Sequence, residues 1–196
     1  MNHDEKSLYI SQIQTDVSLI SFLAVISVFF LGSLLTQFNS YDTFIKIPIS
    51  FLIISTFGFI FAALILSNTT QEIIAGKLDK VKKHVLYGYA ISEYLGVYLF
   101  ILSIPLEVNI ITTNIYLEVT SLVATLLGLF FYQFMGFSII EKHLPKSYRA
   151  FSVFTVFFGV ILFISQLSRF YFTEISIVFL LFILLTTILA LRDDFQ

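Results

Sequence analysis

The sequence predicts an all-α protein: a polytopic membrane helix bundle with six transmembrane helices and both termini in the cytoplasm. Hydrophobic residues make up 58% of the 196 positions, against about 45–50% in soluble proteins. Charged residues make up only 12%, about half of their usual share. Long apolar runs alternate with short polar connectors, which is the pattern of a multi-pass protein.

The apolar runs define the individual spans. A bilayer core about 30 Å thick requires about 20 apolar residues per helix. On this measure the predicted spans are residues 17–36, 47–67, 85–106, 116–140, 150–167 and 174–191. Residues 1–16 form a polar N-terminal tail that lacks the pattern of a cleavable signal peptide. No connector is long enough to build a core of its own, so residues 1–196 form a single transmembrane domain.

The distribution of basic residues predicts the orientation. Nine of the eleven Lys and Arg residues fall on the side of the two termini, and only Lys46 and Arg169 fall on the other side. Basic residues in short connectors favour the cytoplasmic side. We therefore expect a cell-membrane protein with cytoplasmic N and C termini.

The connector 68–84 has two interpretations. Ile74, Leu78 and Val81 recur with the period of one helix face, and Thr69 to Glu72 resemble a capping box. These features predict a short amphipathic helix on the cytoplasmic membrane surface. A solvated basic loop that only follows the charge rule explains the same residues. In either case, four basic side chains are available to contact lipid headgroups or a partner: Lys77, Lys80, Lys82 and Lys83.

The third span contains one acidic residue, Glu93, which lies about 12 Å into the hydrocarbon at 1.5 Å per residue. No basic residue lies in any predicted span, so the protonated form is the expected resting state. Gln133 of the fourth span reaches a similar depth. Glu93 could form a structural hydrogen bond to Gln133, carry protons or ions, or contact a partner protein.

Two stripes accompany Glu93 on the third span. Tyr87, Tyr94 and Tyr98 recur on one face, where they either line a polar cavity or pack as aromatic rings. Tyr89, Tyr94 and Tyr98 are the candidate polar tyrosines inside the membrane. Small residues occupy another face, and the fourth span carries a matching row, which predicts close packing of these two helices. The predicted packing residues are Gly88, Ser92, Gly96, Gly128 and Gly136.

No enzymatic motif is present, and the chain has no cysteine. We therefore expect a protein that is not an enzyme and has no cofactor. His84, Glu141 and His143 are weak candidates for a metal site, although histidines at a membrane interface are common without a metal. Pro105 is expected to close the third span.

The predicted function is that of a small channel or transporter, with a possible proton link through Glu93. The expected partners are the lipid bilayer and either further copies of the chain or other subunits of a membrane complex. A net charge of −2 gives no reason to expect nucleic acid. The alternative is a non-catalytic accessory or scaffold subunit of a larger membrane protein complex.

Overall fold

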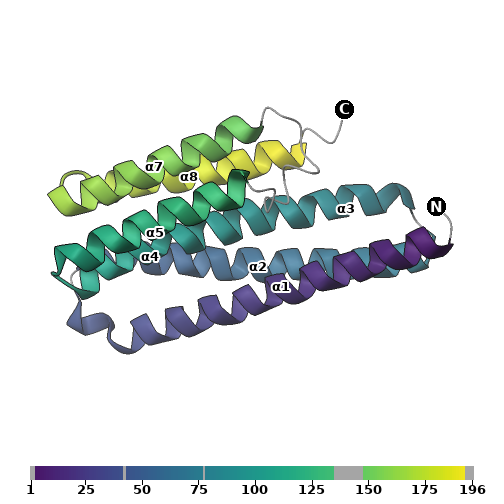
Figure 1. The fold of residues 1–196 in the computed structure, drawn as a ribbon, viewed down its shortest axis with the longest axis horizontal. Coiled ribbons are helices and arrows are strands. Elements are labelled where there is room, and N and C mark those ends of the chain that lie inside the picture. The colour runs from purple at the N-terminus through teal and green to yellow at the C-terminus, as the bar shows by residue number, and fades with distance from the viewer. Residues whose placement is uncertain (1–2, 42, 77, 135–147, 193–196) are drawn as a thin grey trace.

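The computed structural model describes residues 3–41, 43–76, 78–134 and 148–192, and the described residues form helices without any strand. The long helices lie roughly parallel and reverse direction at each connection (Figure 1). They are α1 (His3–Thr36), α2 (Lys46–Ile74), α3 (Leu78–Ile91), α4 (Leu99–Ile111), α5 (Ile115–Phe134), α7 (Tyr148–Ser168) and α8 (Phe172–Arg192). Short 3-10 turns, η1 (Phe38–Ser40) and η2 (Thr43–Ile45), link α1 to α2. A π-helical segment, η3 (Ser92–Tyr98), joins α3 and α4 into one continuous helix.

Five helices among the described residues are long and apolar enough to cross a membrane. They cover Lys6–Thr36, Thr43–Ile74, Lys80–Ile111, Ile115–Tyr132 and Phe172–Leu191, and Val153–Ser168 is a shorter apolar helix. Large apolar side chains also cover the outside of the bundle; Phe29, for example, is 74% exposed. An apolar exterior of this kind is compatible with a membrane protein, because lipid solvates it as well as a protein interior does.

The first and third helices are much longer than the predicted spans. Residues 3–16, predicted to be a polar tail, belong to α1, whose 34 residues extend about 51 Å. The third span continues through Pro105 to Ile111 rather than ending at the proline. Both helices are therefore longer than the thickness of a bilayer core, which is about 30 Å. Figure 1 shows α1 and α3 projecting past α7 and α8 at the end where the N-terminus lies.

The connector 68–84 is helical at both ends, but it does not form one separate helix. α2 continues to Ile74 and α3 starts at Leu78, so the stretch is mostly the end of one helix and the beginning of the next. Thr69 does not cap a helix, because its hydroxyl donates to the carbonyl of Ile65 at 2.8 Å inside α2. Gly76, at φ +76°, supplies the left-handed residue that commonly follows the end of a helix.

Close packing involves α2 and the continuous third helix. A Cβ built on Gly58 of α2 would lie 2.9 Å from the Cβ of Leu95 and 3.0 Å from the amide nitrogen of Gly96. Gly96 in turn faces the ring of Phe59, and Gly88 faces the side chain of Leu66. The small residues of the third span therefore lie against the second span.

The predicted contact between the small residues of the third and fourth spans is not found in the described structure. Gly128 of α5 is exposed, and an added Cβ would meet no described atom within 4 Å. Gly136 lies outside the described residues. The helix α4 does pack against α5, but larger side chains such as Leu129, which is 1% exposed, are buried there.

Candidate functional site

An unusual local structure lies at the middle of the third span. In η3 the backbone follows π-helical rather than α-helical bonding, and such segments are rare and frequently occur at functional sites. Glu93 lies in η3 and is fully buried, with 0% exposure. It follows Lys80, the first residue of the span, by thirteen residues, or about 20 Å of helix. The acid therefore lies near the middle of the bundle.

A tyrosine cluster contacts this acid through Tyr98. The hydroxyl of Tyr98 donates to Oε1 of Glu93 at 3.4 Å, a long hydrogen bond for an O–H donor. The rings of Tyr94 and Tyr98 stack with centroids 6.0 Å apart, and Tyr132 of α5 meets Tyr98 edge-on at 6.4 Å. The tyrosine stripe thus provides both aromatic packing and a polar contact to Glu93.

The predicted hydrogen bond between Glu93 and Gln133 stays a prediction. Gln133 lies in α5, near the tyrosine cluster in sequence, but its side chain is outside the described part of the structure.

Side chains of α2 support the π segment. The hydroxyl of Ser55 donates to the carbonyl of Gly96 at 2.9 Å, and both groups are buried. A π segment changes which carbonyls are bonded along the helix, and a buried carbonyl requires a partner. Gly58 lets the two backbones approach closely enough for Ser55 to reach Gly96. In α2, Ser55 therefore provides a donor for a carbonyl of η3, and Gly58 provides the space that this close approach requires.

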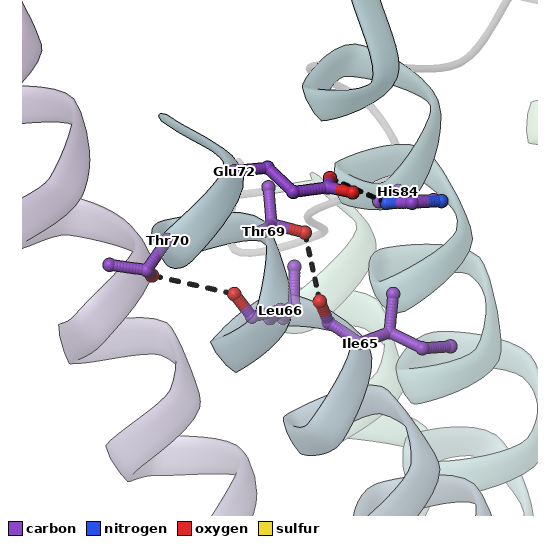
Figure 2. A network of polar contacts seen from close by, with 6 residues as sticks. All are labelled: Ile65, Leu66, Thr69, Thr70, Glu72 and His84. Atoms are coloured by element: carbon purple, nitrogen blue, oxygen red, sulfur yellow. Dashed lines mark hydrogen bonds and ion pairs between the residues drawn. The ribbon is translucent and has the colours of Figure 1, made fainter. Parts of the chain in front are cut away.

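A polar cleft lies at the end of the bundle where α2 joins α3. Its volume is about 550 Å³, and it is lined by Ile65, Asn68, Gln71, Glu72, Ala75 and His84. Figure 2 shows Glu72 of α2 facing His84 of α3, with Nδ1 of His84 2.7 Å from Oε2 of Glu72. The hydroxyls of Thr69 and Thr70 point back along α2 to the carbonyls of Ile65 and Leu66 (Figure 2).

The predicted metal ligands are not assembled in the described structure. His84 meets Glu72, which sequence analysis did not single out, while Glu141 and His143 lie outside the described residues. No group of three potential ligands occurs among the described residues. The metal hypothesis therefore gains no support from the described geometry.

The lysines and Tyr89 lie near the same end. Lys80 and Lys82 are exposed, and Nζ of Lys83 lies 5.4 Å from the ring centre of Tyr87. Lys77 is outside the described residues. Tyr89 is buried and donates its hydroxyl to Oδ2 of Asp16 at 2.6 Å, joining α3 to α1.

A second polar cleft lies at the opposite end, by the turn between α7 and α8. Its volume is about 360 Å³. The lining residues are Phe44, Asn109, Ile110, Thr112, Thr113, Glu118, Gln166, Leu167 and Arg169. Gln166 and Glu118 are only 5% and 7% exposed. Sequence analysis selected none of these residues as a site, because they come from separate helices that only the fold brings together.

Two buried oxygens in this region have no hydrogen-bond partner within the described structure. They are Oε1 of Gln166 and Oε1 of Glu107. Nε2 of Gln166 donates to the carbonyl of Leu106 at 2.9 Å, so the amide is held next to the residue that precedes Glu107. Buried acceptors without a donor are uncommon in folded proteins.

The turn between α7 and α8 has an unusual backbone. The amide of Phe170 donates to the carbonyl of Ser165, and the amide of Arg169 donates to that of Gln166. This is the hydrogen-bond pattern of a Schellman motif, in which glycine normally takes the left-handed position. Here Arg169 occupies it, with φ +56°.

No protein-family model matches the sequence, and no curated protein or solved structure shows significant similarity to it. The residues and geometry described above are therefore the basis for proposing a function.

Proposed function

We propose that the chain is a small six-span transport protein of the cell membrane, with cytoplasmic termini, in which Glu93 carries a proton through the middle of the bilayer. The observation that carries this proposal is the complete burial of Glu93 in a π segment at mid-span. An acid inside a membrane is costly and commonly marks a proton or ion pathway. The mechanism requires neither an enzymatic activity nor a cofactor.

The positions of other titratable groups along the same helix support a proton pathway. His84 precedes Glu93 by nine residues, and Glu107 follows it by fourteen. At 1.5 Å per residue these separations are about 14 Å and about 21 Å, so together they cover the roughly 30 Å hydrocarbon core. His84 lines one end cleft, and Glu107 lies near the opposite one.

The surroundings of Glu93 favour proton transfer over permanent ionisation. The Tyr98 hydroxyl donates a hydrogen bond to Glu93, and a phenol hydroxyl can both donate and accept hydrogen bonds. No basic side chain is present in η3 to stabilise a charged carboxylate. Glu93 would therefore be neutral at rest and would lose its proton only when a polar route to one of the two ends forms.

Proton flux into liposomes containing the purified chain tests this proposal. A potassium gradient with valinomycin drives protons inward, and an acid-sensitive dye inside the vesicles reports them. We expect flux with the wild type, loss of flux with Glu93→Gln, and partial flux with Glu93→Asp. Glu174→Gln is the matched control, because Glu174 is an exposed residue in the first turn of α8.

Two results would contradict the proposal. One is the absence of proton flux with correctly folded wild type. The other is equal flux with wild type and Glu93→Gln when circular dichroism and gel filtration show that both fold alike. Equal flux would assign Glu93 a structural hydrogen bond, because an amide can replace a protonated acid there.

A second candidate role is that of a non-catalytic subunit in a homo-oligomer or a larger membrane complex. The outward face of α5 favours it: Thr120, Ala124 and Gly128 are spaced four residues apart and all are exposed. Small residues in such a row allow another helix to approach closely. Purification in mild detergent tests this role. A defined oligomer or a single stoichiometric partner, lost in Gly128→Leu, is expected if the face docks a helix, whereas a monomer in both forms would contradict it.

A further inference from the structure

We infer that the cleft beside the α7–α8 turn binds a small zwitterionic solute, with an ammonium group on its acidic side and a carboxylate on its arginine side. Its volume of about 360 Å³ falls within the range of small-molecule sites, about 300–1,000 Å³. The inference goes beyond the proposed proton transport, because equilibrium binding requires no movement across the membrane.

The cleft contains acceptor groups that a ligand with hydrogen-bond donors would satisfy. Gln166 lines the cleft, is 5% exposed, and has a side-chain oxygen without a partner in the described structure. Its amide nitrogen is already used by the carbonyl of Leu106, which leaves the amide oxygen as the available group. Glu118 adds a carboxylate to the lining of the cleft. Because an ammonium group has three donors and a positive charge, it complements both acceptors.

The opposite charge in the cleft comes from Arg169. A guanidinium group presents several N–H donors in a planar fork that matches a carboxylate. The backbone of Arg169 is held in the left-handed position of the Schellman turn. The end of α7 therefore fixes the position of the Arg169 Cα at the cleft. One carboxylate and one guanidinium on the walls of a single cleft complement a ligand with both charges better than a ligand with one.

Equilibrium binding of tritiated L-alanine to the full chain in lipid nanodiscs tests the inference. L-alanine is a small zwitterion, ethylamine lacks its carboxylate, and propionate lacks its ammonium group. We expect saturable binding of L-alanine, with ethylamine and propionate competing at least tenfold more weakly than unlabelled L-alanine.

Variants assign the binding to the cleft. Glu118→Gln and Arg169→Gly should each weaken L-alanine binding at least tenfold. Arg169→Gly is suited to this test because glycine adopts the left-handed conformation easily, so the turn should still form. Glu174→Gln, in α8 and outside the cleft lining, is the matched control and should bind like the wild type.

The possible outcomes separate this inference from the proton proposal. Glu93→Gln should bind L-alanine normally even if it loses proton flux. Absence of saturable L-alanine binding to folded wild type would overturn the inference. Competition by ethylamine equal to that of L-alanine would also overturn it, since the site would then recognise a simple organic cation. Unchanged L-alanine binding in Arg169→Gly would show that the guanidinium takes no part in binding, which would also contradict the inference.

Discussion

Replacing Gly58 by alanine should destabilise the bundle by forcing α2 away from η3. The new Cβ would lie 2.9 Å from the Cβ of Leu95, whereas ordinary contacts begin at 3.4 Å. The helices must therefore separate by about 0.5 Å. A gap of this size loses a quarter or more of the dispersion energy of each local contact. The obstacle includes the amide nitrogen of Gly96 at 3.0 Å, which no rotamer change can move. The shift would also stretch the 2.9 Å hydrogen bond from Ser55 to Gly96.

The expected loss of stability follows from two opposing effects. Overpacking a close contact costs about 1–3 kcal/mol, while exchanging glycine for alanine in a helix recovers up to about 1 kcal/mol. We therefore expect Gly58→Ala to lower the free energy of unfolding by about 1–2 kcal/mol.

The same substitution at two other glycines provides matched controls. Gly128→Ala meets no described atom within 4 Å, so only the helix-propensity gain remains and stability should rise by up to about 1 kcal/mol. Gly159→Ala would place a Cβ 2.5 Å from Cδ2 of Leu102. Because that atom is the end of a flexible side chain, this variant should fall between the other two.

Reversible unfolding in mixed micelles with increasing sodium dodecyl sulfate measures these differences, with helix content followed by circular dichroism. The expected order of stability is Gly128→Ala, then Gly159→Ala, then Gly58→Ala. Equal unfolding midpoints for Gly58→Ala and Gly128→Ala would refute the close contact between α2 and η3.

Three further predictions concern the membrane topology, the turn between α7 and α8, and the hydrogen bond between Tyr89 and Asp16. The chain has no cysteine, so Lys80→Cys should be labelled only from the cytoplasm and Thr113→Cys only from outside; labelling of Lys80→Cys in intact cells would contradict the six-span orientation. Arg169→Gly should change the free energy of unfolding by less than about 1 kcal/mol in the same micelle titration, because relief of the left-handed backbone offsets the added chain entropy, and a larger loss would argue against the turn described here. Tyr89→Phe removes a 2.6 Å hydrogen bond to Asp16 and should lower stability by about 1 kcal/mol; an unchanged midpoint in that titration would show that this bond contributes nothing.

Hydropathy predicted the helical fold because the length of an apolar run reflects the thickness of the bilayer core. The same measure failed at the helix ends. Residues 3–16 and 68–74 are polar, so they were assigned to a tail and a connector, yet both are helical. Hydropathy follows the apolar character of the residues, whereas a helix can continue through polar sequence when a neighbouring helix packs against it. Ile13 of α1 and Ile73 of α2 are both fully buried.

The candidate site was only partly predictable. Glu93 stood out because an acid in an apolar span is rare, and its burial agrees with that reasoning. The helix that packs against the small-residue stripe was not predictable. Gly96 could face the second or the fourth span, and the sequence alone does not distinguish them. The cleft at Gln166 was missed because its residues come from separate helices and only the fold brings them together.

The π segment sets the angular phase between the two halves of the third span. One residue inserted into an α-helix as a π segment changes the helix phase by about 100° of rotation. α3 and α4 both pack against α2, but α3 also meets α8, whereas α4 also meets α5 and α7. Deleting one residue from η3 would remove this offset and turn Leu102 away from Gly159, which it contacts closely in the native bundle. The number of residues in η3, as much as their identity, thus influences which neighbours α4 can have.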